Sequence, residues 1–103
     1  MIQAQKLNWS SLIDKNIQYG TNNGTFSPSG TPTTTTITFP HPFNNAPAVM
    51  VIPRSVAQNG VSLYGEIYVA TIRSISNTQA VITLRTNYHN SVNAKYDWLA
   101  IGD

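Results

Sequence analysis

The final third of the chain, residues 61–103, constrains the fold most, because it reads as three β-strands separated by two short turns. Its first predicted strand, 63–74, alternates two sets of side chains, as expected when successive residues point to opposite faces of a sheet. One set consists of Ile67, Val69 and Thr71, and the other of Glu66, Tyr68, Ala70 and Ile72. This arrangement predicts a β-strand over the stretch.

The two strands that follow complete a meander. Strand 80–86 is expected to direct Ile82 and Leu84 inward, and the turn 87–91 leads into strand 92–101. The last strand places Tyr96, Trp98 and Ala100 on one face. Trp98 is expected to anchor a core or an interface rather than to contact a ligand.

Three more strands are predicted upstream, over 16–21, 34–39 and 48–53. An Asn-Gly turn is expected at 22–24, and a Ser/Pro/Gly-rich loop at 27–32. Strand 34–39 is interpreted as an edge, exposed or facing another subunit. The continuous apolar run 49–52 predicts burial on both faces, with the core on one side and another subunit on the other. Six short strands with turns between them predict an all-β, six-stranded antiparallel sandwich.

Composition narrows the classes of function. The 103 residues suffice for one domain, and only 10% of them are charged, against about 25% in typical domains. Abundant Thr, Asn and Ser instead fit an extracellular or virion β-protein. The six basic residues are scattered, which argues against a nucleic-acid partner. The absence of cysteine excludes disulfides and thiolate metal sites.

The N-terminal residues 1–15 are ambiguous between a short helix and an extended arm, and are interpreted as an arm or linker to a fibre shaft, before a domain over 16–103. No apolar run reaches the ~20 residues of a membrane span, so membrane insertion is not expected. The lack of a hydrophobic signal-peptide core, together with the absence of cysteine, favours a phage or bacterial origin.

Five short motifs, taken in order, resemble the H-type lectin family and related tip domains of phage tail fibres and receptor-binding proteins. They are ITFPHPF, APAVMVI, SISNTQAVITLRT, YHN and WLAIGD. The resemblance covers about residues 16–103. It implies a six-stranded sandwich and a homotrimer. It also implies a sugar site at Tyr88, His89 and Asn90, with Tyr in place of the more usual Trp. Gly30 and Thr31, in the loop before the second strand, would contribute further contacts to the sugar.

The chemistry of this turn suits a sugar, because an aromatic ring packs on the C–H face of a pyranose while imidazole and amide groups fix its hydroxyls. The alternative is a polar hairpin turn whose Tyr88 covers a neighbouring strand. Two departures weaken a direct transfer of lectin specificity. Residues 63–67 lack the Arg that sugar-binding members carry early in strand four, and 92–94 lack a following Tyr.

Arg73 and Arg85 lie in neighbouring predicted strands, where they are expected to approach one another. They could bind an anionic glycan, but the favoured interpretation is an exposed or inter-subunit ion pair with Glu66 or Asp97. His41 lies between two prolines and is expected to cap that corner. No nucleophile elbow, phosphate loop or paired metal-ligand spacing occurs, so neither an enzyme nor a metal or other cofactor is expected.

Three functional hypotheses remain. The first is a non-enzymatic module at a virion fibre tip that recognises a host-surface glycan. The second is a structural domain that trimerises or caps a fibre without binding a receptor. The third is a free-standing lectin.

Overall fold

The computed structural model describes residues 15–28, 30–54 and 67–103, and none of these residues is helical. The strands are β1 (Asn16–Pro28), β2 (Thr33–Thr38), β3 (Ala48–Pro53), β4 (Tyr68–Ile75), β5 (Gln79–Thr86) and β6 (Val92–Gly102). The predicted all-β fold is confirmed. The predicted arm lies, apart from Lys15, outside the described residues, as does the first part of the strand expected over 63–74.

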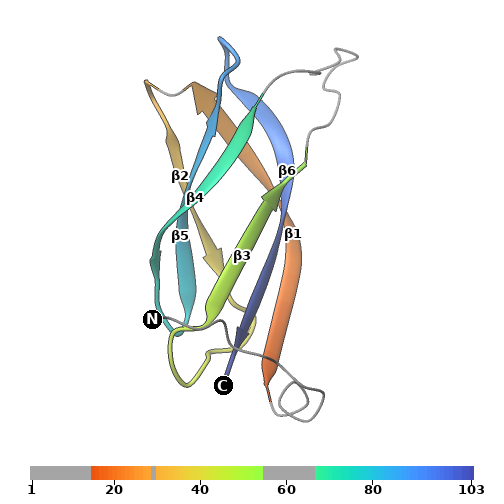
Figure 1. The fold of residues 1–103 in the computed structure, drawn as a ribbon, viewed down its shortest axis with the longest axis vertical. Helices are drawn as coiled ribbons and strands as arrows, with labels where there is room; N and C mark the ends of the chain where they lie inside the picture. The colour runs from red at the N-terminus through yellow and green to blue at the C-terminus, as the bar shows by residue number, and fades with distance from the viewer. Residues whose placement is uncertain (1–14, 29, 55–66) are drawn as a thin grey trace, which may run out of the picture.

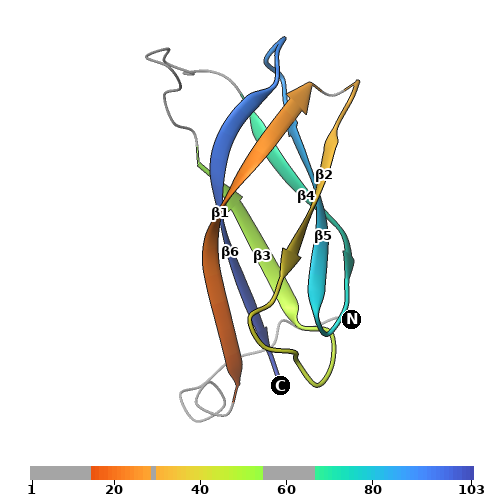
Figure 2. The same ribbon diagram turned by 180° about the vertical axis from the view of Figure 1, so that it is seen from behind.

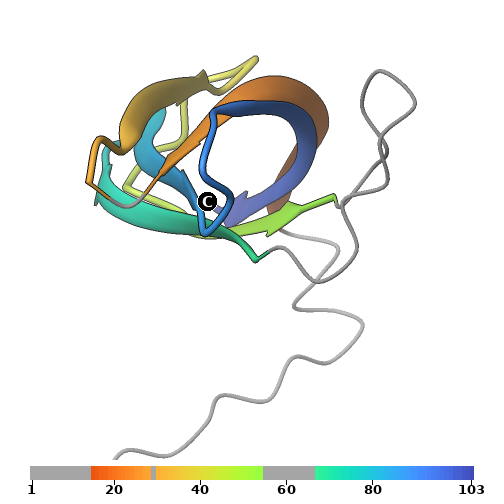
Figure 3. The ribbon, with the colours of Figure 1, turned by 90° about the horizontal axis from the view of Figure 1, so that it is seen from above.

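Two three-stranded antiparallel sheets face one another and are joined through a single strand (Figures 1 and 2). In one sheet β6 lies between β1 and β3, and in the other β5 lies between β2 and β4. The end of β1 crosses between them and pairs with β5 in parallel, at Ser27–Arg85 and Pro28–Thr86. This short parallel junction is an addition to the predicted antiparallel sandwich. The strands together have the rounded, barrel-like outline seen in Figure 3, and the two joined sheets are therefore called the barrel.

The prediction of an Asn-Gly turn at 22–24 is wrong, because β1 runs unbroken from Asn16 to Pro28. Asn22, Asn23 and Gly24 pair with consecutive residues of β6 instead. Gly24 serves close packing: a Cβ added there would lie 2.5 Å from Cδ1 of Leu84 and 3.0 Å from Cε1 of Tyr96. The glycine thus marks a tight approach of side chains within a strand rather than a reversal of the chain.

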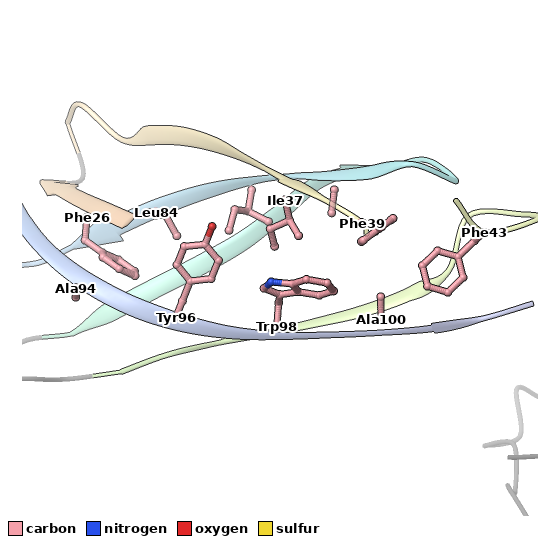
Figure 4. Packing of buried hydrophobic residues seen from close by; sticks show 11 residues of the cluster. Phe26, Ile37, Phe39, Phe43, Leu84, Ala94, Tyr96, Trp98 and Ala100 are labelled. Atoms are coloured by element: carbon pink, nitrogen blue, oxygen red, sulfur yellow. The ribbon is translucent and has the colours of Figure 1, made fainter. Parts of the chain in front are cut away.

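The core lies between the two sheets and is rich in aromatic side chains (Figure 4). Its β6 layer is Ala94, Tyr96, Trp98 and Ala100, and Ile82 and Leu84 are fully buried on β5, as predicted for both strands. Phe26 and Tyr68 make an edge-to-face contact with ring centroids 5.4 Å apart. Phe39 packs on Phe43 in the same manner at 5.1 Å and tilts against Trp98 at 5.9 Å. Trp98 is therefore a core anchor.

The connection from β2 to β3 forms a corner that buried polar contacts hold in place. Gln18 is 7% exposed. Its Nε2 donates to the carbonyl oxygen of His41 at 2.8 Å, and its Oε1 accepts from the His41 N–H at 3.0 Å. Phe43 N–H donates to the carbonyl oxygen of Asn77, which ties the same corner to the β4–β5 turn. The His41 backbone, rather than its imidazole, therefore carries the role expected of this residue.

The apolar run on β3 is buried on one face only within this chain. Val49 and Val51 pack against the core, whereas Met50 is 56% and Ile52 is 55% exposed. In the single chain, the predicted burial therefore holds for the core-facing side of β3, whereas the opposite side, with Met50 and Ile52, is exposed.

Candidate functional site

The predicted aromatic-His-Asn turn joins β5 to β6 at one end of the barrel, the upper end in Figure 1. Its first residue is held by the strand next to it. Asn87 Oδ1 accepts from Ile67 N–H at 2.7 Å, and Asn87 N–H donates to the Ile67 carbonyl oxygen at 3.2 Å. Tyr88 N–H donates to Oγ1 of Thr86 at 3.2 Å. These bonds fix where the turn leaves the sheet.

The two rings of the turn lie against one another. The ring centroids of Tyr88 and His89 are 4.3 Å apart, with an interplanar angle of 40°. Tyr88 is half-buried, while His89 and Asn90 are exposed. The turn thus brings a half-buried aromatic ring, an exposed imidazole and an exposed amide side by side.

The loop between β1 and β2 reaches the same end of the barrel (Figure 3). Its tight turn is closed by Thr31 N–H, which donates to the Pro28 carbonyl oxygen at 2.8 Å. Gly30 and Thr31 are exposed, and a Cβ at Gly30 would meet no atom within 4 Å. The site residues named from the sequence therefore gather at one end, from two connections that are far apart in the chain.

A chain of hydroxyl groups links the two connections. Ser91, at the end of the β5–β6 turn, donates from its Oγ to Oγ of Ser27 at 3.3 Å. Ser27 Oγ also makes a short hydrogen bond with Oγ1 of Thr33, the first residue of β2. Ser27 is only 6% exposed, so this link lies beneath the surface that carries the candidate residues. Sequence reasoning gave Ser27 no role, because a serine in a polar loop carries no distinguishing pattern.

Within the chain, Asp97 pairs with Arg54 rather than with Arg73 or Arg85; the predicted pairing between subunits stays a prediction. Asp97 accepts from Nε and Nη2 of Arg54 at 2.8 and 2.9 Å, and from Thr21 Oγ1 at 2.5 Å, on the outer face of the β1-β6-β3 sheet. The hydrogen bond from Arg54 lowers the pKa of Asp97, with Thr21 adding to the effect, and the same pair raises the pKa of Arg54. Arg73 and Arg85 belong to the other sheet. The alternative partner, Glu66, lies outside the described residues.

Two shallow grooves flank Arg85 on the outer face of the β4–β5 pair. One, of about 340 Å³, is lined by Pro32, Thr71, Arg73, Thr83 and Arg85. The other, of about 210 Å³, is lined by Ile67, Val69, Arg85, Thr86 and Asn87. Arg73 and Arg85 thus line one groove, although they lie several residues apart along the paired strands. The grooves were not predicted from the sequence, because they depend on how the strands are paired. One available signal was that Thr71 and Arg73, like Thr83 and Arg85, occupy alternate positions and so share one face of the sheet.

Within the described parts of the chain, no cluster of three or more His, Cys, Asp or Glu side chains could hold a metal ion. The same parts contain no helix of the length and apolar character that a membrane crossing requires.

The fold and this end of the barrel define an all-β domain of the kind found in fibre proteins of phages and phage-like particles. The sequence model of the H-type lectin domain matches residues 34–101. That match covers more than half of the chain, and the protein therefore belongs to the H-type lectin domain family. No curated protein sequence shows a significant match.

Three solved structures are similar to this chain, each over 84% of its length. The C-terminal part of the R1 pyocin fibre of Pseudomonas aeruginosa matches with a TM-score of 0.65 and 26% identity, over 23% of the fibre chain. An N-truncated R1-type pyocin tail fibre matches with the same TM-score and identity, over 70% of its chain. The tailspike protein gp49 of Pseudomonas phage LKA1 matches in fold, with a TM-score of 0.61 and 24% identity over 15% of its chain. This chain thus spans less than a quarter of the first and third of these proteins.

Proposed function

We propose that this domain is the carbohydrate-binding part of a virion fibre and recognises a glycan on the host surface. The observation that carries the proposal is the Tyr88–His89 ring pair, with Tyr88 half-buried and His89 exposed, on an anchored turn beside the Gly30–Thr31 loop. Membership of the H-type lectin domain family and likeness to pyocin fibres support it. The site would lie on the virion or outside the cell.

The proposed contacts follow from the chemistry of the turn. The Tyr88 ring packs on the C–H face of a sugar, while His89 and Asn90 exchange hydrogen bonds with its hydroxyls. Backbone groups near Gly30 approach the ligand closely because no side chain intervenes there. Binding of this kind needs no chemical step, so the module is proposed to be non-enzymatic.

The proposed partners besides the glycan are two further copies of this chain and the rest of a fibre. Single sugar contacts of this type are weak. Three sites on one homotrimer, repeated over several fibres, would raise the effective affinity by presenting the sites together. β1 begins at Asn16 at the end opposite the β5–β6 turn (Figure 1). β1 therefore begins far from the proposed site.

The test is binding of the purified domain to an array of bacterial surface polysaccharides and to whole bacterial cells. Tyr88→Ala and Asn90→Ala are expected to reduce binding about tenfold or more, because each removes a direct contact. Asn77→Ala is the matched control, since Asn77 is an exposed turn residue at the opposite end of β5. Equal losses in all three variants, or unchanged binding in the first two, would contradict the assignment of the site. Melting temperatures show whether each variant still folds.

A second candidate function is a structural domain that trimerises and caps a fibre without a receptor. The observation that favours it is the exposed apolar face of the β1-β6-β3 sheet, where Tyr19, Met50 and Ile52 are 77%, 56% and 55% exposed. The missing Arg at 63–67 also favours it. A well-formed trimer that binds neither the array nor cells would support this candidate over the first.

A further inference from the structure

Arg73 and Arg85 project from the outer face of the β4–β5 pair, on either side of a row of threonines. Val69 pairs with Arg85 and Thr71 with Thr83, and a register shift between Ile72 and Ser74 places Arg73 in a bulge. Four residues of strand separate Val69 from Arg73, or about 13 Å at the usual rise of about 3.3 Å per residue. Bulges redirect side chains, and here both arginines line the same groove.

The charge of this groove is not balanced by the acids that the structure describes. Asp97 is bound by Arg54, and Asp103 by Lys15 at 2.8 Å, both away from the β4–β5 face. In residues 15–28, 30–54 and 67–103, neither Arg73 nor Arg85 makes an ion pair. Two guanidinium groups along one groove leave it with a local excess of positive charge, which attracts anionic groups.

The groove has a built floor. Ile82 and Leu84 of β5 point into the core, so Thr83 points outward between them, yet it is only 8% exposed because the groove walls cover it. Pro32 closes one side, next to the Gly30–Thr31 loop. The second groove shares Arg85 and extends to Asn87, the residue that begins the β5–β6 turn. Together the two grooves form a trough from Arg73 past Arg85 to the foot of the proposed sugar site.

We infer that this trough binds an anionic polysaccharide, with Arg73 and Arg85 each pairing with a carboxylate, phosphate or sulfate group along one polymer strand. The planar guanidinium binds such groups through two parallel hydrogen bonds, which a lysine cannot reproduce. Hydroxyl groups of the polymer would meet the Thr71 hydroxyl between the two charges. The inference rests on the proposed function and adds to it a class of ligand: an acidic rather than a neutral glycan.

The experiment compares binding of the full chain to dextran, carboxymethyl dextran and dextran sulfate of matched length, as immobilised probes at several salt concentrations. Wild type is expected to bind the two acidic polymers and not dextran, with affinity that falls as salt rises. Arg73→Gln and Arg85→Gln are each expected to weaken binding to an acidic polymer about tenfold. Lys95→Gln is the control, because it removes one positive charge from the opposite sheet, where Lys95 is exposed. Arg73→Lys and Arg85→Lys keep the charge and are expected to recover only part of the loss.

The outcomes separate this inference from the proposed function. If Lys95→Gln weakens binding as much as the groove variants do, binding reflects overall charge, and the inference is overturned. If Arg73→Gln and Arg85→Gln leave binding to acidic polymers and to cells unchanged while Tyr88→Ala abolishes cell binding, the inference fails and the proposed function stands. If wild type binds no acidic polymer and no cell, both fail.

Discussion

Gly24 shows how a single position fixes the shape of the barrel. A methyl group there would lie 2.5 Å from Leu84 Cδ1 and 3.0 Å from Tyr96 Cε1, and both side chains are fully buried. We expect Gly24→Ala to destabilise the fold by about 1–3 kcal/mol, because the well-packed core must shift to admit the methyl group. The measurement is the free energy of unfolding in urea.

Gly30→Ala is the matched control for Gly24→Ala. No atom lies within 4 Å of a Cβ at Gly30, so the same methyl group should leave the unfolding free energy nearly unchanged. Equal stability of the two variants would mean that β1 does not approach β5 and β6 as closely as the structure shows.

The residue scale also shows what sequence reasoning could and could not find at the candidate site. Tyr88, His89 and Asn90 were named because an aromatic, an imidazole and an amide side by side form a recognisable pattern. Ser27 escaped, because its role depends on contacts with residues far along the chain. The pairing of Asp97 with Arg54 was missed for the same reason, because Arg54 reaches it across a strand pairing that spacing alone does not reveal.

At the scale of elements, alternation and apolar runs predicted β3, β5 and β6 well, whereas turn signals misplaced the end of β1. The bounds of β3 match the predicted range of 48–53, and β5 and β6 differ from theirs by one residue at one end. The Asn-Gly pair in β1 was wrongly interpreted as a turn, because Gly24 is required there by the close packing of Leu84 and Tyr96. Local sequence thus identifies strands reliably here, while the demands of the core decide where a strand continues through residues that usually form turns.

The corner between β2 and β3 yields a prediction at this scale. Gln18→Glu replaces the Nε2 donor, 2.8 Å from the His41 carbonyl oxygen, with a second acceptor in a buried position. We expect a loss of about 1–3 kcal/mol, because a buried carbonyl loses its donor and faces a carboxylate oxygen. The exposed Gln79→Glu on β5 makes the same chemical change at the surface and should leave the unfolding free energy nearly unchanged. A similar stability of both variants would show that Gln18 does not hold the corner.

At the scale of the whole molecule, the two outer faces of the barrel differ in character. Two rows of paired residues, Tyr19–Leu99–Met50 and Ile17–Ile101–Ala48, make one half of the outer face of the β1-β6-β3 sheet apolar, while the other half carries Asp97 and Lys95. The opposite sheet presents Thr34, Thr36 and Thr38 on β2 beside the arginine trough of β4 and β5. An exposed apolar patch of several side chains is unusual for a monomer. In the proposed homotrimer this face is therefore the one buried against the other copies, with the polar face and its trough turned outward.

The oligomeric state tests that arrangement. Met50→Asp places a charge in the middle of the apolar face, at a residue that is 56% exposed in the single chain. If this face joins three copies, the variant should sediment and scatter light as a monomer, because an unpaired charge at the centre of an apolar interface is strongly unfavourable. The monomer should still fold, since Met50 lies outside the core. Thr36→Asp is the control: it adds the same charge to an exposed position of the opposite sheet and should leave the trimer intact. A trimer that survives Met50→Asp but not Thr36→Asp would assign the contact to the polar face, and would then place the arginine trough inside the assembly, where a polysaccharide could not reach it.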